Sequence, residues 1–333
     1  MNKWIIAAGI SLLGLTAAAG AEACASCGCS LGTDWADLNA STKGGFSLDL
    51  RYDYLDQDQL RWRTGTISPV AASRIVNDGN PQEVETYTKN QYLTATLDYS
   101  SGGNWGVNVS VPYIARDHQT LGTASDGITE GPGGGSYVSS TSDFGDVRII
   151  GRYSGFLPRH NFGVLFGLKL PTGRTGLTGT STDPTEPEPV TIDPGLQPGT
   201  GTTDLIAGAY YAGSLNMNWV YYSQFLYQRA FDTVKAYRPG DSYNLSFGLK
   251  YLGFDRFTPQ LQLNARYLRH DTGAAADQVS TGGTLVYLSP GVNVPVSKRM
   301  AVYGFVQLPV YQAVNGVQLA PKYIASVGVR YSF

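Results

Sequence analysis

The chain has 333 residues, of which 15% are charged, a net charge of −2 at pH 7, and many Gly (41) and Tyr (22) residues. Disordered chains have few aromatic residues and a high net charge, nucleic-acid binders are basic, and bundles of membrane helices need several apolar runs of about 20 residues, so all three classes are disfavoured. The mean hydropathy of −0.15 is slightly polar, which together with a charge fraction well below the usual value of about 25% indicates an all-β protein.

The N-terminus has the pattern of a secretory signal peptide over residues 1–23. Lys3 supplies the positive charge, residues 4–19 form the apolar core, and small residues close the segment at a site suited to cleavage. A membrane anchor is the alternative, but the apolar run is short for one. We therefore expect the chain to be exported from the cytoplasm.

All three cysteines lie in one cluster directly after this segment, at Cys24, Cys27 and Cys29. Three thiolates could bind a soft metal such as Cu(I) or Zn, so these residues are the candidate metal ligands. A c-type haem needs His after the second Cys of such a motif, and Gly28 stands there. The alternatives are one disulfide with a spare thiol, or linkage to a lipid or another chain. We assign residues 24–43 to a periplasmic N-terminal segment that contains the cluster.

Apolar and polar residues alternate along most of the chain from residue 44 onward. Near the C-terminus, for example, Tyr323, Val327 and Tyr331 share one face, and Ser326 and Arg330 share the other. Because successive side chains of a strand point to opposite sides of a sheet, the pattern predicts strands throughout. The expected strands are residues 45–62, 86–101, 104–118, 142–156, 160–172, 202–215, 217–231, 241–254, 256–270, 282–297, 299–313 and 321–333.

Two further features favour a membrane barrel over a soluble β-sandwich or propeller. Aromatic residues end the apolar faces, as Trp105 and Tyr113 do, and aromatic girdles are typical of outer-membrane barrels. Short connectors alternate with long ones, such as 118–142 and 313–321, which would place turns on one rim and loops on the other. We predict an all-β, transmembrane, antiparallel up-and-down β-barrel of about 12 strands over residues 44–333, embedded in the lipid bilayer of the bacterial outer membrane.

Charged residues on the inward faces are candidate pore-lining residues. They are Asp49, Arg51, Asp53, Asp98, Asp146, Arg148, Arg152, Lys169, Lys250, Arg266 and Arg330. Their mixed signs allow either a network of ion pairs that fills the barrel or a selective conduit. Inward aromatic residues are expected at Tyr92, Tyr210, Tyr222, Tyr287, Tyr303 and Phe305. Side chains fill an eight-stranded barrel, and sixteen strands leave a wide channel, so we expect a narrow or plugged pore. We expect the long loop at residues 173–200 to fold over or into the mouth.

Four short motifs resemble a known family. They are Asp143-Phe144-Gly145-Asp146, Gly167-Leu168-Lys169-Leu170-Pro171-Thr172-Gly173, Gly199-Thr200-Gly201-Thr202-Thr203-Asp204 and Tyr331-Ser332-Phe333. Together they are similar to the outer-membrane transporter family labelled for the MetA-pathway of phenol degradation, over residues 45–333. The resemblance implies a β-barrel that passes small, often aromatic, compounds. Asp146 and Lys169 are expected to lie inward on neighbouring strands, where they could pair.

The expected function is porin-like transport of small solutes, including small aromatic or organic compounds, by passive selective diffusion. The alternative is a structural, redox or metal-linked outer-membrane protein that docks a periplasmic partner through its N-terminal cysteines. An enzyme is not expected, because His118, His160 and His270 lie beside no recognisable Ser motif and the chain contains no G-x-S-x-G or P-loop. We expect no catalytic residue, no nucleic-acid partner and no cofactor apart from a soft metal at the cysteines.

Overall fold

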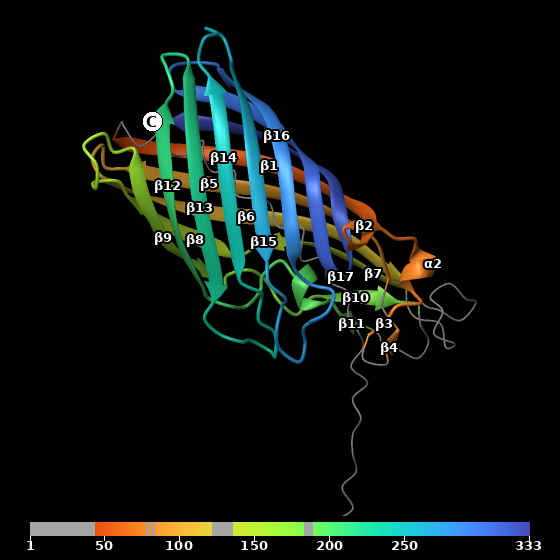
Figure 1. The fold of residues 1–333 in the computed structure, drawn as a ribbon. Helices are drawn as coiled ribbons and strands as arrows, with labels where there is room; N and C mark the ends of the chain where they lie inside the picture. The colour runs from red at the N-terminus through yellow and green to blue at the C-terminus, as the bar shows by residue number, and fades with distance from the viewer. Residues whose placement is uncertain (1–43, 78–79, 82–83, 122–135, 183–188) are drawn as a thin grey trace, which may run out of the picture.

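The computed structural model describes residues 44–333, except 78–79, 82–83, 122–135 and 183–188. The expected signal peptide and the segment with Cys24, Cys27 and Cys29 lie outside the described residues. The described chain forms a closed, tilted barrel of antiparallel strands (Figure 1). Its helices are short, and in the described part of the chain none is long and apolar enough to cross a membrane.

Long strands form the wall of the barrel. They are β1 (Gly45–Arg63), β5 (Val84–Ser100), β6 (Trp105–Leu121), β7 (Ser136–Phe144), β8 (Val147–Tyr153), β9 (Phe162–Leu170), β12 (Asp204–Ser214), β13 (Trp219–Ala230), β14 (Ser242–Tyr251), β15 (Thr258–Leu268), β16 (Gly283–Pro295) and β17 (Met300–Ser332). The pairing of β1 with β17 closes the ring. Smaller elements lie in the long loops. They are β2 (Gly65–Thr66), helix α2 (Pro69–Ala72), β3 (Val76–Asn77), β4 (Asn80–Pro81), β10 (Thr178–Ser181), β11 (Val190–Thr191) and the 3-10 helix η3 (Pro194–Leu196).

Two features of the pairing set the number of wall strands. β7 and β8 share one position in the ring, because β7 pairs with the second half of β6 and β8 with the first half. β17 is a hairpin, since its first half pairs with β16 and its second half with β1. The backbone N–H of Ser332 donates to the carbonyl of Arg299 at 2.8 Å, so the two halves lie side by side. Among the described residues the wall therefore has twelve strands, as predicted.

The strand boundaries differ most from the prediction in two places. Residues 313–321 were expected to form a long loop, but both halves of β17 continue to a tight turn near Gly316, whose φ is 54°. The alternation is broken there because residues 317–321 are all buried, with Val317 and Leu319 packed against the small elements of the first long loop. Residues 136–141, also expected to be a loop, belong to β7. Ser140 on this strand donates to Asp117 at 2.7 Å, and a strand with such polar partners needs no apolar face.

The outward face of the barrel is apolar between two aromatic belts. On five wall segments, aromatic residues eight positions apart mark the belts: Phe46 and Tyr54, Trp105 and Tyr113, Trp219 and Tyr227, Tyr243 and Tyr251, Tyr323 and Tyr331. With a rise of about 3.4 Å per residue and a tilt of about 40°, eight residues span about 21 Å along the membrane normal, close to the apolar band of about 25 Å on outer-membrane barrels. Exposed apolar residues such as Leu245 and Phe247 fill the space between. The chain is a transmembrane β-barrel of the bacterial outer membrane.

The two ends of the barrel differ. The short turns and the C-terminus lie at one end, and the long loops with β10, β11 and α2 lie at the other (Figure 1). In this class of barrel the short turns face the periplasm and the long loops face the outside. We call these the turn end and the loop end.

Candidate functional site: lumen and mouth of the barrel

The predicted pore-lining residues all lie on the inward face of the wall. Eight are buried, namely Asp49, Asp53, Asp98, Asp146, Arg152, Lys169, Lys250 and Arg266. Arg51, Arg148 and Arg330 are partly buried and lie on the same inward faces. Where no loop covers a wall one strand thick, a side chain is buried only when it points into the barrel, because the other side is open.

Ion pairs and a tyrosine hydrogen bond near the turn end join wall strands, and Asp98–Arg152 joins two that are not adjacent. Arg152 on β8 makes a bidentate pair with Asp98 on β5, in which Nη2 lies 3.0 Å from Oδ2. Asp49 on β1 accepts hydrogen bonds from Arg330 Nη2 at 3.2 Å and from the Tyr303 hydroxyl at 2.8 Å. Charge-assisted bonds of this kind are stronger than neutral ones, so they stiffen the wall and narrow this end of the lumen.

An apolar layer crosses the lumen near the level of the loop-side aromatic belt. It consists of Leu55, Tyr92, Ile114, Leu285, Tyr287, Val314 and Ile324. A second inward cluster, of Leu165, Tyr210 and Tyr222, lies nearer the turn end. The six aromatic residues that the sequence placed inside are each at most 7% exposed, which confirms their inward position. A water-filled pore would leave such side chains accessible, so the lumen is packed at these levels.

The connection between β9 and β12 folds back into the loop end of the barrel. We call its described parts, residues 171–182 and 189–203, the mouth segment. Arg116 on β6 points inward and donates from Nη1 to the carbonyl of Gly195 at 3.1 Å, so η3 lies inside the mouth. The expected position of residues 173–200 at the mouth is therefore confirmed for the described part.

A buried carboxylate anchors both ends of the mouth segment to the wall. Asp146, between β7 and β8, accepts hydrogen bonds at Oδ2 from Lys169 Nζ (2.9 Å), Thr200 N (3.0 Å) and Thr200 Oγ1 (2.9 Å). Its Oδ1 accepts from the backbone N–H of Gly173 at 3.0 Å. Lys169 also pairs with Asp204 at 3.2 Å. We call Asp146, Lys169, Gly173, Thr200 and Asp204 the anchor cluster, and it contains the Asp146–Lys169 pair that the sequence suggested.

Two glycines of the anchor cluster region are required by close backbone contact. The ends of the mouth segment cross there, and a Cβ atom on Gly199 would lie about 2.4 Å from the backbone of Gly173. A side chain at either position would push the two crossing segments of backbone apart. The three Gly-rich motifs of the sequence therefore meet at one point of the fold and build the anchor.

The loop end also holds polar residues that sequence reasoning did not select. Arg116 donates to the Tyr92 hydroxyl at 3.2 Å and, through Nε, to Asn90. Asn90 in turn donates to Gln57 at 2.7 Å. The alternation that puts Ile114 inward also puts Arg116 inward two residues later, so the signal was present in the sequence. These residues hold the wall and the mouth segment together.

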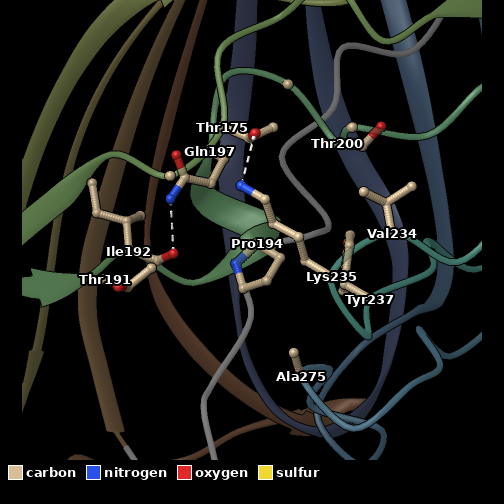
Figure 2. Close-up of a pocket in the computed structure, with 13 residues that line it drawn as sticks. Thr175, Thr191, Ile192, Pro194, Gln197, Thr200, Val234, Lys235, Tyr237 and Ala275 are labelled. Atoms are coloured by element: carbon tan, nitrogen blue, oxygen red, sulfur yellow. Dashed lines mark hydrogen bonds between the residues drawn. The ribbon is translucent and has the colours of Figure 1, made fainter.

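A cavity of about 220 Å³ opens at the mouth, between the mouth segment and the loops after β13 and β15 (Figure 2). Its walls are Thr175, Gly176, Thr191, Ile192, Pro194, Gln197, Gly199, Thr200, Gly201, Val234, Lys235, Tyr237 and Ala275. Gln197 supports one wall by donating to the carbonyl of Ile192 at 2.8 Å and by accepting from Leu177 N at 3.0 Å. Hydrogen bonds within the mouth segment therefore hold this wall of the cavity in place.

The described residues contain no group of three or more His, Cys, Asp or Glu side chains placed to hold a metal ion. The candidate ligands Cys24, Cys27 and Cys29 lie outside that part of the chain. The anchor cluster holds two carboxylates with a lysine between them, and its oxygens are already bound to donors of the protein.

The architecture defines the chain as a member of the outer-membrane β-barrel class. It is similar to the COG4313 outer membrane channel from Pseudomonas putida F1, with a TM-score of 0.58 and 12% sequence identity over 87% of this chain and 96% of that chain. Weaker similarity extends to the CymD monoaromatic hydrocarbon channel (TM-score 0.49, 13% identity, 87% and 89% of the two chains). The Pseudomonas putida toluene transporter TodX is at a similar level (TM-score 0.49, 12% identity, 94% and 97%). No family model and no curated protein matches the sequence.

Proposed function

We propose that this protein is a passive channel that lets small solutes, among them small aromatic or organic compounds, cross the bacterial outer membrane. The observation that carries the proposal is a closed transmembrane barrel whose mouth is occupied by a separately anchored segment. The wall strands are joined by continuous ladders, and opening a ladder in lipid leaves backbone groups without partners. The mouth segment is held to the wall by the anchor cluster, by Arg116 and by a short ladder between β10 and β7 that pairs Thr180 with Val138 and Ser181 with Tyr137. These contacts are far fewer than those between wall strands, so the segment is the part that can move.

The chemistry of the lumen supports small and weakly polar solutes. Ion pairs such as Asp98–Arg152 and Asp49–Arg330 offset part of the inward charge. The apolar layer and the inward tyrosines offer surfaces on which a ring or short hydrocarbon could slide. The family resemblance carried by the Gly-rich motifs points to the same solutes.

Solute flux into liposomes tests this proposal. Purified protein is reconstituted, and uptake of benzyl alcohol is compared with uptake of a disaccharide and with protein-free liposomes. We expect faster entry of the small aromatic alcohol only. A variant that lacks residues 173–200 should show a higher single-channel conductance in planar bilayers, and an unchanged conductance would remove this loop from the pathway. A folded protein that passes no solute would contradict the channel function.

We propose a separate role for the N-terminal segment, because all three cysteines of the sequence lie in it. In this scheme residues 1–23 are removed on export, and Cys24, Cys27 and Cys29 bind a soft metal or a periplasmic partner. Mass spectrometry after alkylation, combined with metal analysis of the purified protein, tests this. Three free thiols without bound metal would contradict the metal site.

A further inference from the structure

The mouth cavity has the size and the walls of a binding site for one small ring. Apolar cavities of about 150 Å³ hold benzene, and this cavity measures about 220 Å³. Ile192 and Tyr237 form buried walls, being 1% and 5% exposed, and Pro194, Val234 and Ala275 continue the apolar surface. A single ring with one small substituent would therefore fit and displace water from apolar surface.

A lysine supplies the formal charge of this site. Lys235 is the only charged residue among those that line the cavity, all of which lie in the described part of the chain. Figure 2 shows its side chain extending toward Thr175, whose Oγ1 lies 3.4 Å from Nζ. Gly176 leaves space beside the ammonium group, since a Cβ atom added to it would lie 3.6 Å from Nζ. An anionic oxygen in the cavity could therefore reach the ammonium group and a threonine hydroxyl together.

The backbone around Lys235 is held in an uncommon conformation. Lys235 and Ala236 have φ values of 49° and 60°, and left-handed conformations at residues other than glycine cost of order 1 kcal/mol. The turn is fixed by paired backbone bonds between Val234 and Tyr237, both 2.9 Å long. Tyr237 is tied by its hydroxyl to Asp271 in the next loop at 2.9 Å. The lysine is thus presented from a rigid turn, and strain of this kind is common where a ligand is bound.

We propose that this cavity binds compact anions of single-ring size, of which aromatic carboxylates are the model class. The ring packs against Ile192, Pro194 and Tyr237, and the carboxylate lies on Lys235 Nζ. This inference rests on the proposed channel function, because it makes the cavity the point at which a solute is captured before it enters the lumen.

Direct binding to the purified full-length protein tests the site. Isothermal titration calorimetry compares benzoate with benzamide, which has nearly the same shape but no charge. We expect benzoate to bind about tenfold more tightly, which corresponds to about 1.4 kcal/mol, and we expect this preference to fall as salt is added. Equal affinities, or no binding of either compound, would overturn the proposal.

Variants separate the charge of the lysine from the shape of the cavity. Lys235→Met keeps the aliphatic stem and tolerates the same φ, and it should remove the preference for benzoate, whereas Lys235→Arg should keep it. Ala275→Trp should fill the cavity and abolish binding of both compounds. Lys298→Met removes an exposed lysine from a turn at the opposite end, so it is the matched control and should bind like the unmodified protein. A preference that survives Lys235→Met would refute the site.

The two proposals fail in different ways. Flux of neutral solutes without benzoate binding would overturn the cavity site and leave the channel function intact. Binding of benzoate with no flux of any solute would leave the site intact and contradict the channel function.

Discussion

Replacing Asp146 with asparagine should release the mouth segment and open the channel more often. The carboxylate receives four hydrogen bonds, from Lys169, from Gly173 and, twice, from Thr200. These bonds tie both ends of the mouth segment to the wall, through Gly173 and Thr200. Asparagine keeps one acceptor oxygen but turns an NH2 group toward donors, so it cannot replace the carboxylate.

The size of the effect follows from the burial of the pair. Removing one partner of a buried ion pair costs about 3–5 kcal/mol. Lys169 keeps a second carboxylate, Asp204, at 3.2 Å, so we take the lower end of that range for Asp146→Asn. A loss of about 3 kcal/mol changes an equilibrium constant by about two orders of magnitude, so the ratio of open to closed mouth should rise about 100-fold.

Single-channel recording in planar bilayers measures this ratio as the fraction of time spent at high conductance. Asp143→Asn is the matched control, since Asp143 also pairs with the mouth segment, through Arg174 at 3.3 Å. Arg174 is 67% exposed, and exposed pairs contribute at most about 1 kcal/mol, so this variant should behave almost like the unmodified protein. If Asp146→Asn folds and shows an unaltered open fraction, the anchor does not hold the mouth closed.

Other parts of the barrel give further predictions. Asp98→Asn leaves Arg152 buried without its carboxylate and should destabilise the barrel by about 3–5 kcal/mol. The unfolding temperature in detergent should fall, and the fraction of time that the channel spends at high conductance should not change. Tyr303→Phe removes the hydrogen bond to Asp49 and should cost about 1–2 kcal/mol, and an unfolding temperature equal to that of the parent would contradict the role of this bond. Burial raises the pKa of the Asp271 carboxyl above its ordinary 3.8, so its loop should be most stable below that pH and lose stability as the pH rises through the shifted value. Amide-exchange protection factors across this range measure the effect, and protection that increases with pH would refute it.

The fold was predictable because a membrane barrel repeats one physical rule on every strand. Outward residues contact lipid and inward residues contact the lumen, so a period of two predicts the strands even when single segments are weak. The rule no longer applies where the chain leaves the hydrocarbon layer of the membrane. Val317 and Leu319 are buried against small loop elements, and residues 136–141 remain in a strand on which Ser140 has a polar partner. Both departures lie at the loop end.

The candidate site was predictable in part. Alternation assigned the inward charges and tyrosines, because it depends only on parity along a strand. It could not reveal that Gly173 and Thr200, far apart in sequence, meet on Asp146, since that contact depends on the path of an irregular loop. The cavity beside Lys235 was missed for the same reason, as three loops contribute to it.

A comparison of costs indicates which barrier controls passage. A ring that crosses the apolar layer has to displace side chains such as Tyr92 and Tyr287, and an off-rotamer torsion costs about 0.5–1.5 kcal/mol. The ion pair between Asp98 and Arg152 joins wall strands, so breaking it weakens the wall without clearing the mouth. Release of the anchor at Asp146 costs about 3 kcal/mol or more and is the step that moves a whole segment. A ring small enough to cross the layer with one or two such torsions meets its larger cost at the anchor, so for these solutes the anchor rather than the lumen should set the rate of opening.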